Sequence, residues 1–283
     1  MEMFFLNVYK EKGITSFDVI FKLRKILKIK KIGHSGTLDP LACGVMQVGV
    51  GYGAKLLDYL DGDKKYRAKI KFGFTSDTLD DESEKIFVKK PDFTRENLEE
   101  HLQKFLGKTQ QIPPKYSAIK IGGKKLCDLA RNNKEIPEIK PREIEIYQIK
   151  LENFNGFDEA EIFVHCSSGT YIRSLIRDLG ENLDCGAYMS DLERVSAGNF
   201  DIKNSAKIDE NILNHKINPI DVLNLNKYFL DENEYKKIKH GNPIKTNLTN
   251  SDKKYMLIYD NKLVSIANLY NDTLKVEKVF EVE

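Results

Sequence analysis

The chain has few cysteines, and they lie far apart. Only four occur in 283 residues, together with five histidines. No two cysteines form a C-x-x-C pair, and no two histidines show the H-x-x-x-H spacing of a metal site on a helix. The sequence therefore predicts neither a metal site nor a disulfide framework, and this cysteine usage is typical of the cytoplasm. The four cysteines are Cys43, Cys127, Cys166 and Cys185.

Long apolar runs are also absent. No run approaches the roughly 20 residues needed to cross a bilayer. Residues 1–6 lack the basic segment and long apolar core of a signal peptide, and we expect them to form a first β-strand instead. The sequence therefore predicts no membrane partner and a cytoplasmic location.

Net charge is nearly absent, because 45 basic residues face 43 acidic ones for a formal charge of +2. That balance argues neither for nor against a nucleic-acid partner. The basic residues are nevertheless concentrated in two stripes, Lys22–Lys31 and Lys64–Lys71. Such stripes can bind a polyanion locally, although a solvated helix face accounts equally well for the first of them.

The chain is long for one average domain, so two domains are expected. Hydrophobic residues make up 41% of it, enough for a substantial core. From about residue 224 short apolar segments alternate with polar turns, which is typical of a small antiparallel β-barrel. We predict domains at 1–223 and 224–283.

Apolar spacing predicts the main elements of the larger domain. A helix capped by Thr15 or Ser16 should run to about Leu27, with a buried stripe at Val19, Leu23, Ile26 and Leu27. Residues 65–72 alternate as a half-buried strand with a cationic outer face. A second helix is expected at 94–106. Two prolines exclude a helix interior at 111–118, and we expect a basic excursion from the core at about 110–140.

Residues 33–45, GHSGTLDPLACGV, carry the clearest chemical signal. Glycines allow a close backbone approach to a ligand, and Pro40 biases Asp39 toward an extended conformation. The result is a stiff loop that holds one carboxylate at a defined angle, as a nucleophile or base requires. The spacing alone fits a glycine-rich surface turn equally well.

This segment resembles the catalytic loop of the TruB family of tRNA pseudouridine synthases, G-H-[ST]-G-T-L-D-P-x-A-x-G. Similar segments follow in family order. Residues 63–66 (DKKY) and 166–180, with the core G-T-Y-[IV]-R, match two of them, and residues 111–131 resemble Q-x-P-P-x-Y-S-A. The C-terminal segment resembles a PUA RNA-binding domain. Three positions depart from the family pattern: Glu11 replaces a proline, Cys127 replaces a tyrosine, and Glu193 stands where arginine is common.

The resemblance implies roles for individual residues. Asp39 would be the catalytic carboxylate, with Arg173 as its partner. Tyr66 would also be catalytic, stacking on the target uracil and taking part in proton transfer at C5. An arginine in the first turn of a helix opposes the helix dipole, so Arg173 should have a partner elsewhere. His34 would enter the space that the extruded nucleotide leaves. The other residues implied in substrate binding are Thr37, Lys64, Tyr171 and Leu192.

The resemblance also implies a fold and an activity. The fold is α+β, a mixed and mainly antiparallel sheet flanked by helices, followed by the PUA-like barrel. The activity is isomerisation of uridine 55 in the T-loop of tRNA, with no cofactor and no guide RNA, by a monomer that also assists tRNA folding. Three alternatives are a TruB-like RNA chaperone, a guide-dependent relative, and an unrelated hydrolase with an aspartate nucleophile.

Overall fold

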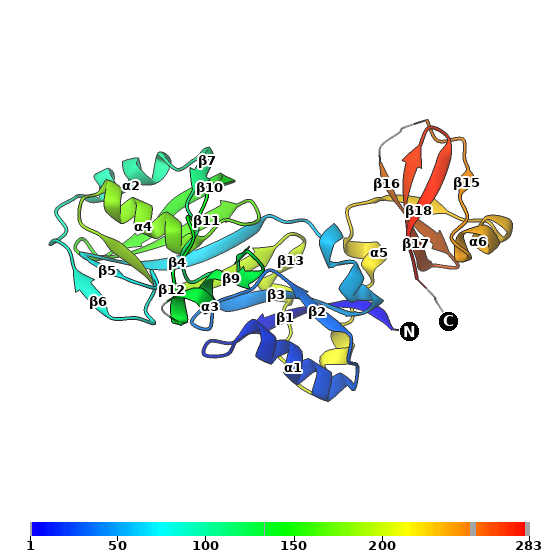
Figure 1. Ribbon diagram of the computed structural model, residues 1–283, viewed down its shortest axis with the longest axis horizontal. Helices are drawn as coiled ribbons and strands as arrows, with labels where there is room; N and C mark the ends of the chain where they lie inside the picture. Colours follow the sequence, from blue (N-terminus) through cyan, green and yellow to red (C-terminus); the bar gives the residue numbers. More distant parts are fainter. Residues whose placement is uncertain (1, 133, 250–252, 281–283) are drawn as a thin grey trace.

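The computed structural model describes residues 2–132, 134–249 and 253–280. Two β-sheets lie beside each other along the longest axis, the larger built from the first 200 or so residues and the smaller from the C-terminal segment (Figure 1). The α-helices are α1 (Ser16–Leu27), α2 (Arg95–Gln103), α3 (Leu126–Arg131), α4 (Ile172–Asn182), α5 (Pro219–Val222) and α6 (Glu232–Lys239). Short 3-10 helices are η1 (Tyr52–Lys55), η2 (Leu57–Tyr59), η3 (Ile202–Asn204) and η4 (Ile212–His215).

The larger sheet has nine strands in the order β1-β3-β12-β4-β11-β10-β7, with β2 paired to β3 and β13 to β12. Only the β3–β12 pair is parallel, so the sheet is mixed and mainly antiparallel, as predicted. The strands are β1 (Met3–Lys10), β2 (Ile32–Ser35), β3 (Cys43–Gly51), β4 (Lys64–Phe72), β7 (Gly107–Gln111), β10 (Arg142–Phe154), β11 (Glu159–Cys166), β12 (Ala187–Ala197) and β13 (Phe200–Asp201). Two small hairpins accompany it, β5 (Phe74–Ser76) with β6 (Lys85–Phe87) and β8 (Lys120–Ile121) with β9 (Lys124–Lys125).

Strand β4 shows why one face of this sheet is buried. Its even-numbered residues from Tyr66 to Phe72 lie in the main core, where α2 and α4 also bury their apolar residues. This confirms the alternation predicted for 65–72. The odd-numbered cations lie on the opposite face and have acidic neighbours: Arg67 pairs with Glu152 at 3.0 Å, and Lys71 with Glu159 at 2.7 Å. Of the predicted basic stripe, only the first member, Lys64, reaches the cavity described below.

Helix α1 begins where the sequence predicted. The Thr15 hydroxyl caps it by accepting a hydrogen bond from the backbone N–H of Asp18, and the Asp18 carboxylate accepts one from the backbone N–H of Thr15, forming a capping box. Val19 and Leu23 are buried against β1 and β3, but Ile26 is exposed, so its assignment to the buried stripe was wrong. The buried face of α1 instead includes Ile20.

The smaller sheet has five strands in the order β14-β16-β17-β18-β15 and curls into a half-barrel with α6, as expected for a PUA-like module (Figure 1). The prediction that it is antiparallel throughout was wrong, because β14 pairs with β16 in parallel; its other pairs are antiparallel. Asp-Asn and Asn-Asp turns join its central strands, with Asp260, Asn261 and Asn271 in the left-handed region. Its strands are β14 (Asn226–Phe229), β15 (Ile244–Lys245), β16 (Lys254–Tyr259), β17 (Lys262–Tyr270) and β18 (Thr273–Val279).

The two sheets share an apolar cluster. Met256 and Phe280 from the C-terminal segment pack with Phe5 and Leu56 of the larger unit. The ring of Phe280 also meets Tyr52 edge to face, at 5.7 Å between centroids. The division at residues 223 and 224 stays a prediction, and this cluster places apolar contacts across it.

No helix within the described ranges is long and apolar enough to cross a membrane.

Gly44 sits where the catalytic-loop segment enters β3, and its neighbours leave no room for a side chain. Its φ is +108°, and a Cβ there would lie 2.3 Å from the carbonyl oxygen of Arg194. Gly156 has φ +80° and nothing within 4 Å of the same position.

We therefore expect Gly44→Ala to lower the free energy of unfolding by roughly 3 kcal/mol or more, since backbone strain and steric overlap add. Gly156→Ala should cost only about 1–2 kcal/mol, from the strain alone. Urea unfolding followed by circular dichroism tests the difference. Equal losses in both variants would show that the Arg194 backbone moves aside.

Candidate active site

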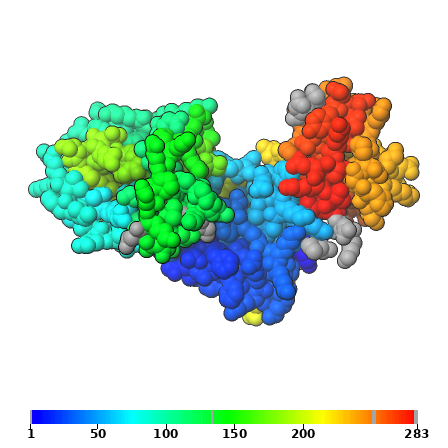
Figure 2. Space-filling model, viewed as in Figure 1, coloured from blue at the N-terminus to red at the C-terminus, as the bar shows by residue number. Residues whose placement is uncertain are grey.

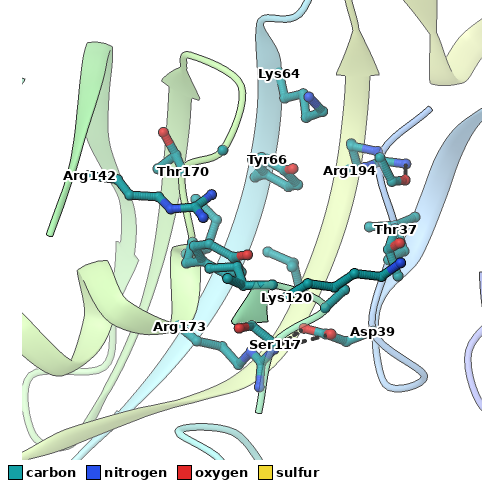
Figure 3. Close-up of a pocket in the computed structure, with 18 residues that line it drawn as sticks. Thr37, Asp39, Lys64, Tyr66, Ser117, Lys120, Arg142, Thr170, Arg173 and Arg194 are labelled. Atoms are coloured by element: carbon teal, nitrogen blue, oxygen red, sulfur yellow. Dashed lines mark hydrogen bonds and ion pairs between the residues drawn. The ribbon is translucent and has the colours of Figure 1, made fainter. Parts of the chain in front are cut away.

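A cavity of about 480 Å³ opens beside the central strands β4 and β12 of the larger sheet (Figure 3). Its walls come from the loop before β3, from β4 and β12, from residues 117–120 and from the N-terminal turn of α4. This volume is within the range of small-molecule sites. The sequence-predicted residues that line it are Thr37, Asp39, Lys64, Tyr66, Tyr171, Arg173 and Leu192.

Asp39 and Arg173 form an ion pair in the wall of this cavity, although 134 positions separate them (Figure 3). The guanidinium Nη2 lies 3.0 Å from Asp39 Oδ2 and 3.2 Å from Oδ1. Arg173 is buried, whereas a third of the Asp39 side chain is exposed to the cavity. The predicted partner of the helix-initial arginine is therefore the carboxylate.

Three groups besides Asp39 hold the guanidinium of Arg173 in place. Its Nη1 donates to the carbonyl of Thr78 at 3.0 Å and lies 3.4 Å from the carboxylate of Asp80, and its Nη2 donates to the carbonyl of Tyr116 at 2.9 Å. Ser174, the next residue of α4, donates to the carbonyl of Ile112 at 2.8 Å. Arg173 thus aims at Asp39 without freedom to rotate.

Asp80 is a site residue that sequence reasoning missed. It lies in the 76–84 turn among several other acids, where the pattern predicts only a solvated loop. In the structure its side chain is 2% exposed, and it accepts from the Thr78 hydroxyl and the Glu82 backbone N–H. No local sequence pattern distinguishes Asp80 from its neighbour Asp81. Only the contact of Asp80 with Arg173 in the structure identifies it as a site residue.

Opposing effects act on the Asp39 carboxyl. Burial raises its pKa above the ordinary value, the charges of Arg173 and Lys10 oppose that rise, and the Asp80 carboxylate adds to it. The net effect is a raised pKa for Asp39. The ionised form of Asp39 therefore depends on its cationic neighbours.

Tyr66 lies on the cavity floor as a buried ring. Burial raises its pKa to about 12, so its hydroxyl stays protonated at neutral pH. Lys64, one pleat away on the same face of β4, has its pKa lowered by burial and donates to the carbonyl of Gly62. The cavity therefore offers a neutral aromatic face beside an ammonium group.

Tyr171 is held by Gln111, which sequence reasoning did not single out. The Gln111 side chain accepts from the Tyr171 backbone N–H at 2.8 Å and donates to its carbonyl at 3.1 Å. This two-way contact fixes the end of β7 to the start of α4. It explains why the proline-containing segment after Gln111 runs beside the cavity, where Ser117 and Lys120 line it.

Lys10 anchors the segment 33–45 that carries Asp39. Its buried ammonium donates to the carbonyl of Ala42 at 2.6 Å and lies 3.4 Å from that of Pro40. Burial lowers the pKa of Lys10 to about 8. The loop keeps this anchor despite Glu11, which stands in place of the family's proline.

Arg194 also supports the loop and is fully buried. Its guanidinium donates to the carbonyls of Val45 at 2.7 Å and Gly36 at 3.1 Å. Its neighbour Glu193 stands where arginine is common in the family. Arg194 itself bonds inward to the loop.

His34 is the predicted site residue that is not among those lining the cavity. It lies half-buried on β2, and within the described residues its Nδ1 has no hydrogen-bond partner. Burial, with the charge of Arg194, lowers its pKa, so the ring is uncharged at neutral pH. Its predicted insertion into a stack of bases stays a prediction.

Across the part of the chain that the structure describes, no group of three or more His, Cys, Asp or Glu side chains is placed to hold a metal ion. The cavity instead holds carboxylate, guanidinium, ammonium and aromatic groups. Such a set suits an electron-poor heterocycle and a nearby phosphate.

Curated relatives match nearly the whole chain. It is 43% identical to a tRNA pseudouridine synthase B of Clostridium novyi over 97% of this chain and 98% of the relative. It is also 43% identical to one of Fusobacterium nucleatum, over 94% and 96%.

Solved structures share the fold at lower identity. A chain from an H/ACA ribonucleoprotein bound to a substrate RNA containing 2′-deoxyuridine matches with a TM-score of 0.73 and 20% identity, covering 99% of this chain and 85% of that one. A chain from a Cbf5-Nop10-Gar1 complex matches with a TM-score of 0.73 and 22% identity, over 98% and 85%.

Family models agree with these similarities. The model of the TruB family pseudouridylate synthase N-terminal domain matches residues 24–172, and that of the tRNA pseudouridylate synthase B C-terminal domain matches residues 173–223. With the Asp39 loop and the Arg173 helix brought together at one cavity, this chain belongs to the TruB family of pseudouridylate synthases.

Proposed function

We propose that the protein isomerises uridine 55 in the T-loop of tRNA to pseudouridine in the cavity that contains Asp39. The observation that carries the proposal is the Asp39–Arg173 pair, 3.0 Å apart beside the buried ring of Tyr66. The curated relatives, more than 40% identical over nearly full length, support tRNA as the substrate.

The reaction rearranges bonds without a net change in composition. The bond between N1 of uracil and C1′ of ribose breaks, the base turns, and C5 bonds to C1′. C5 loses its proton, and N1 gains one. Because nothing is oxidised and no phosphate is transferred, the balance of atoms and electrons requires no co-reactant.

The target nucleotide must leave the stacked loop to reach Asp39, which costs roughly a few kcal/mol. Stacking on Tyr66 offsets this cost, and the cavity walls at Tyr171 and Leu192 enclose the base. Asp39 then assists cleavage of the glycosidic bond as a carboxylate that Arg173 keeps ionised and oriented. Since the pKa of Tyr66 is about 12, we assign its protonated ring to stacking rather than to proton removal as a phenolate.

The rest of the chain would bind RNA around this cavity. Lys64, Lys120 and Arg142 line the cavity and supply positive charge for the phosphates beside the target. We assign residues 224–283 to an RNA-binding domain of PUA type and propose that the enzyme acts as a monomer without guide RNA.

The test is tritium release from a tRNA transcript labelled at uridine C5, with purified protein, no cofactor and no guide. We expect at most one equivalent per tRNA, and none from a transcript with cytidine at position 55. Release from the cytidine-55 transcript would contradict the assignment of the site. Tight binding without release would favour a chaperone or a guide-dependent subunit.

A further inference from the structure

Helix α1 carries exposed aromatic residues that its buried face does not require. Phe17 is 63% exposed and Phe21 is 48% exposed. They lie four positions apart, so their rings stand on the same side of the helix, opposite the residues that pack on the sheet. Arg24 and Lys25 continue this side by helical spacing, and Lys28 follows as the C-cap residue of α1, in the left-handed region. We call these five residues the α1 stripe.

Two cations of the α1 stripe lie over its two rings. The Lys25 ammonium lies 4.4 Å from the centroid of the Phe21 ring, and the Arg24 guanidinium lies 6.0 Å from that of Phe17. Aromatic rings beside cations are the composition of surfaces that bind single-stranded nucleic acid. A purely structural helix face needs no exposed phenylalanine.

The positive charge of the α1 stripe is not neutralised. In the described ranges, Arg24, Lys25 and Lys28 have no carboxylate within 4.0 Å. The only acidic residue of α1 is Asp18, whose carboxylate is engaged by the Thr15 cap. Strand β4 differs, because Arg67 and Lys71 are each paired with acids. The α1 stripe is therefore complementary to a polyanion.

The α1 stripe is joined directly to the catalytic loop. The hydroxyl of Ser16 donates to the carbonyl of Leu38 at 3.0 Å, and the backbone N–H of Leu38 donates back to it at 2.9 Å. Ser16 precedes Phe17, and Leu38 precedes Asp39. Figure 2 shows the blue surface of α1 and the green surface of the segment around residue 120 exposed on one face of the molecule. An RNA that reaches Asp39 thus passes close to Phe17.

We propose that the α1 stripe is a second RNA-binding surface, which stacks unpaired bases of the substrate RNA on Phe17 and Phe21 and binds its phosphates through Lys25 and Lys28. The occupant is unpaired RNA because exposed rings can stack only on bases that are splayed out of a helix. This inference rests on the proposed function for the identity of the RNA.

The test compares two double variants with a matched control. Phe17→Gln/Phe21→Gln removes both exposed rings without emptying the core. Phe157→Gln removes a ring that is similarly exposed, at 52%, and similarly paired with a lysine, Lys90, at 5.6 Å. Phe157 lies in the β10–β11 turn, at the opposite end of β4 from Lys64, because Glu159 pairs with Lys71 and Cys166 with Lys64.

We expect Phe17→Gln/Phe21→Gln to raise the Kd for a fluorescently labelled, unmodified tRNA transcript roughly 25-fold or more, because each of the two stacked bases contributes about fivefold or more. Phe157→Gln should leave Kd unchanged. Lys25→Gln/Lys28→Gln should reduce the slope of log Kd against log salt by roughly 1.4–1.8, for two phosphate contacts. Circular dichroism and thermal melting check that each variant is folded.

Equal Kd values for Phe17→Gln/Phe21→Gln and the unsubstituted chain would overturn the proposal. So would an unchanged salt slope in the lysine variant, or a self-association of the unsubstituted chain that the phenylalanine variant abolishes. Fluorescence anisotropy measures tRNA binding without catalysis. The proposal for the α1 stripe can therefore be contradicted independently of the proposed reaction. If Phe17→Gln/Phe21→Gln binds tRNA more weakly but neither it nor the unsubstituted chain forms pseudouridine, the proposed reaction is contradicted and the proposed RNA-binding surface is supported.

Discussion

Asp39→Asn is expected to reduce tritium release from C5-labelled tRNA by at least roughly 10³-fold while leaving tRNA binding intact. Asparagine keeps the shape of the side chain but carries no negative charge and cannot act as a nucleophile or base. The fold should survive, because Arg173 keeps its contacts to Asp80 and to the carbonyls of Thr78 and Tyr116. Single-turnover assays with excess enzyme measure the chemical step directly.

The matched control is Asp81→Asn. Asp81 follows Asp80 in the sequence, is exposed, and pairs only with the nearby Lys85 among the described residues, so neutralising it removes one charge without touching the cavity. It should keep activity within about twofold, because an exposed pair of this kind contributes little. If Asp39→Asn kept more than a tenth of the rate of the unsubstituted chain, Asp39 would not be the catalytic carboxylate. Retained tRNA folding by this variant would show that any chaperone role is independent of Asp39.

Arg173→Lys should lower the single-turnover rate roughly 10²-fold or more and change its pH dependence. A lysine keeps one charge, but it cannot reach Asp39, Asp80 and two carbonyls together as the planar guanidinium does. Arg173 lowers the pKa of Asp39, which burial otherwise raises. Weakening that contact should therefore raise the pKa of Asp39 further.

The sign of the pH effect follows from which form is active. If the carboxylate of Asp39 is the working form, activity is present above its pKa and is lost as pH falls through it. Arg173→Lys should therefore move the acidic limb of the rate profile to higher pH, and part of the lost rate should return at alkaline pH.

Arg177→Lys is the control on the same helix. Arg177 pairs with Asp178 and does not contact Asp39 in the structure, so its rate profile should match that of the unsubstituted chain. An acidic limb that stays in place in Arg173→Lys, with the rate reduced at every pH, would mean that Arg173 only positions the loop.

Asp80 also acts on the ion pair between Asp39 and Arg173. It stands on the far side of the guanidinium from Asp39, and its charge raises the pKa of Asp39 while its contact with Nη1 orients Arg173. The carboxylates of Asp39 and Asp80 both contact the Arg173 guanidinium, which therefore stabilises two negative charges rather than one. The exposed third of Asp39 faces the cavity, where the nucleotide would enter.

The sequence predicted those elements whose residues follow a clear local period. The helix cap at Thr15 or Ser16, the alternation of β4 and the polar turns of the smaller sheet depend on neighbours within a few positions. The structure confirms all three, with Thr15 as the capping residue. The assignment of Ile26 to the buried stripe was wrong because it lies at the edge of the apolar face, where the shape of the neighbouring sheet decides burial.

The sequence by itself determined the family, the loop that carries Asp39 and the helix that carries Arg173, because these motifs are contiguous and chemically distinctive. Only the tertiary structure decided which other residues support them. Asp80 lies 93 positions from Arg173, and Arg194 lies 158 positions from Gly36. Such partners meet because the order of strands in the sheet brings their elements together, and no local pattern records that order. The same packing decided that Phe17 and Phe21 face solvent rather than the core.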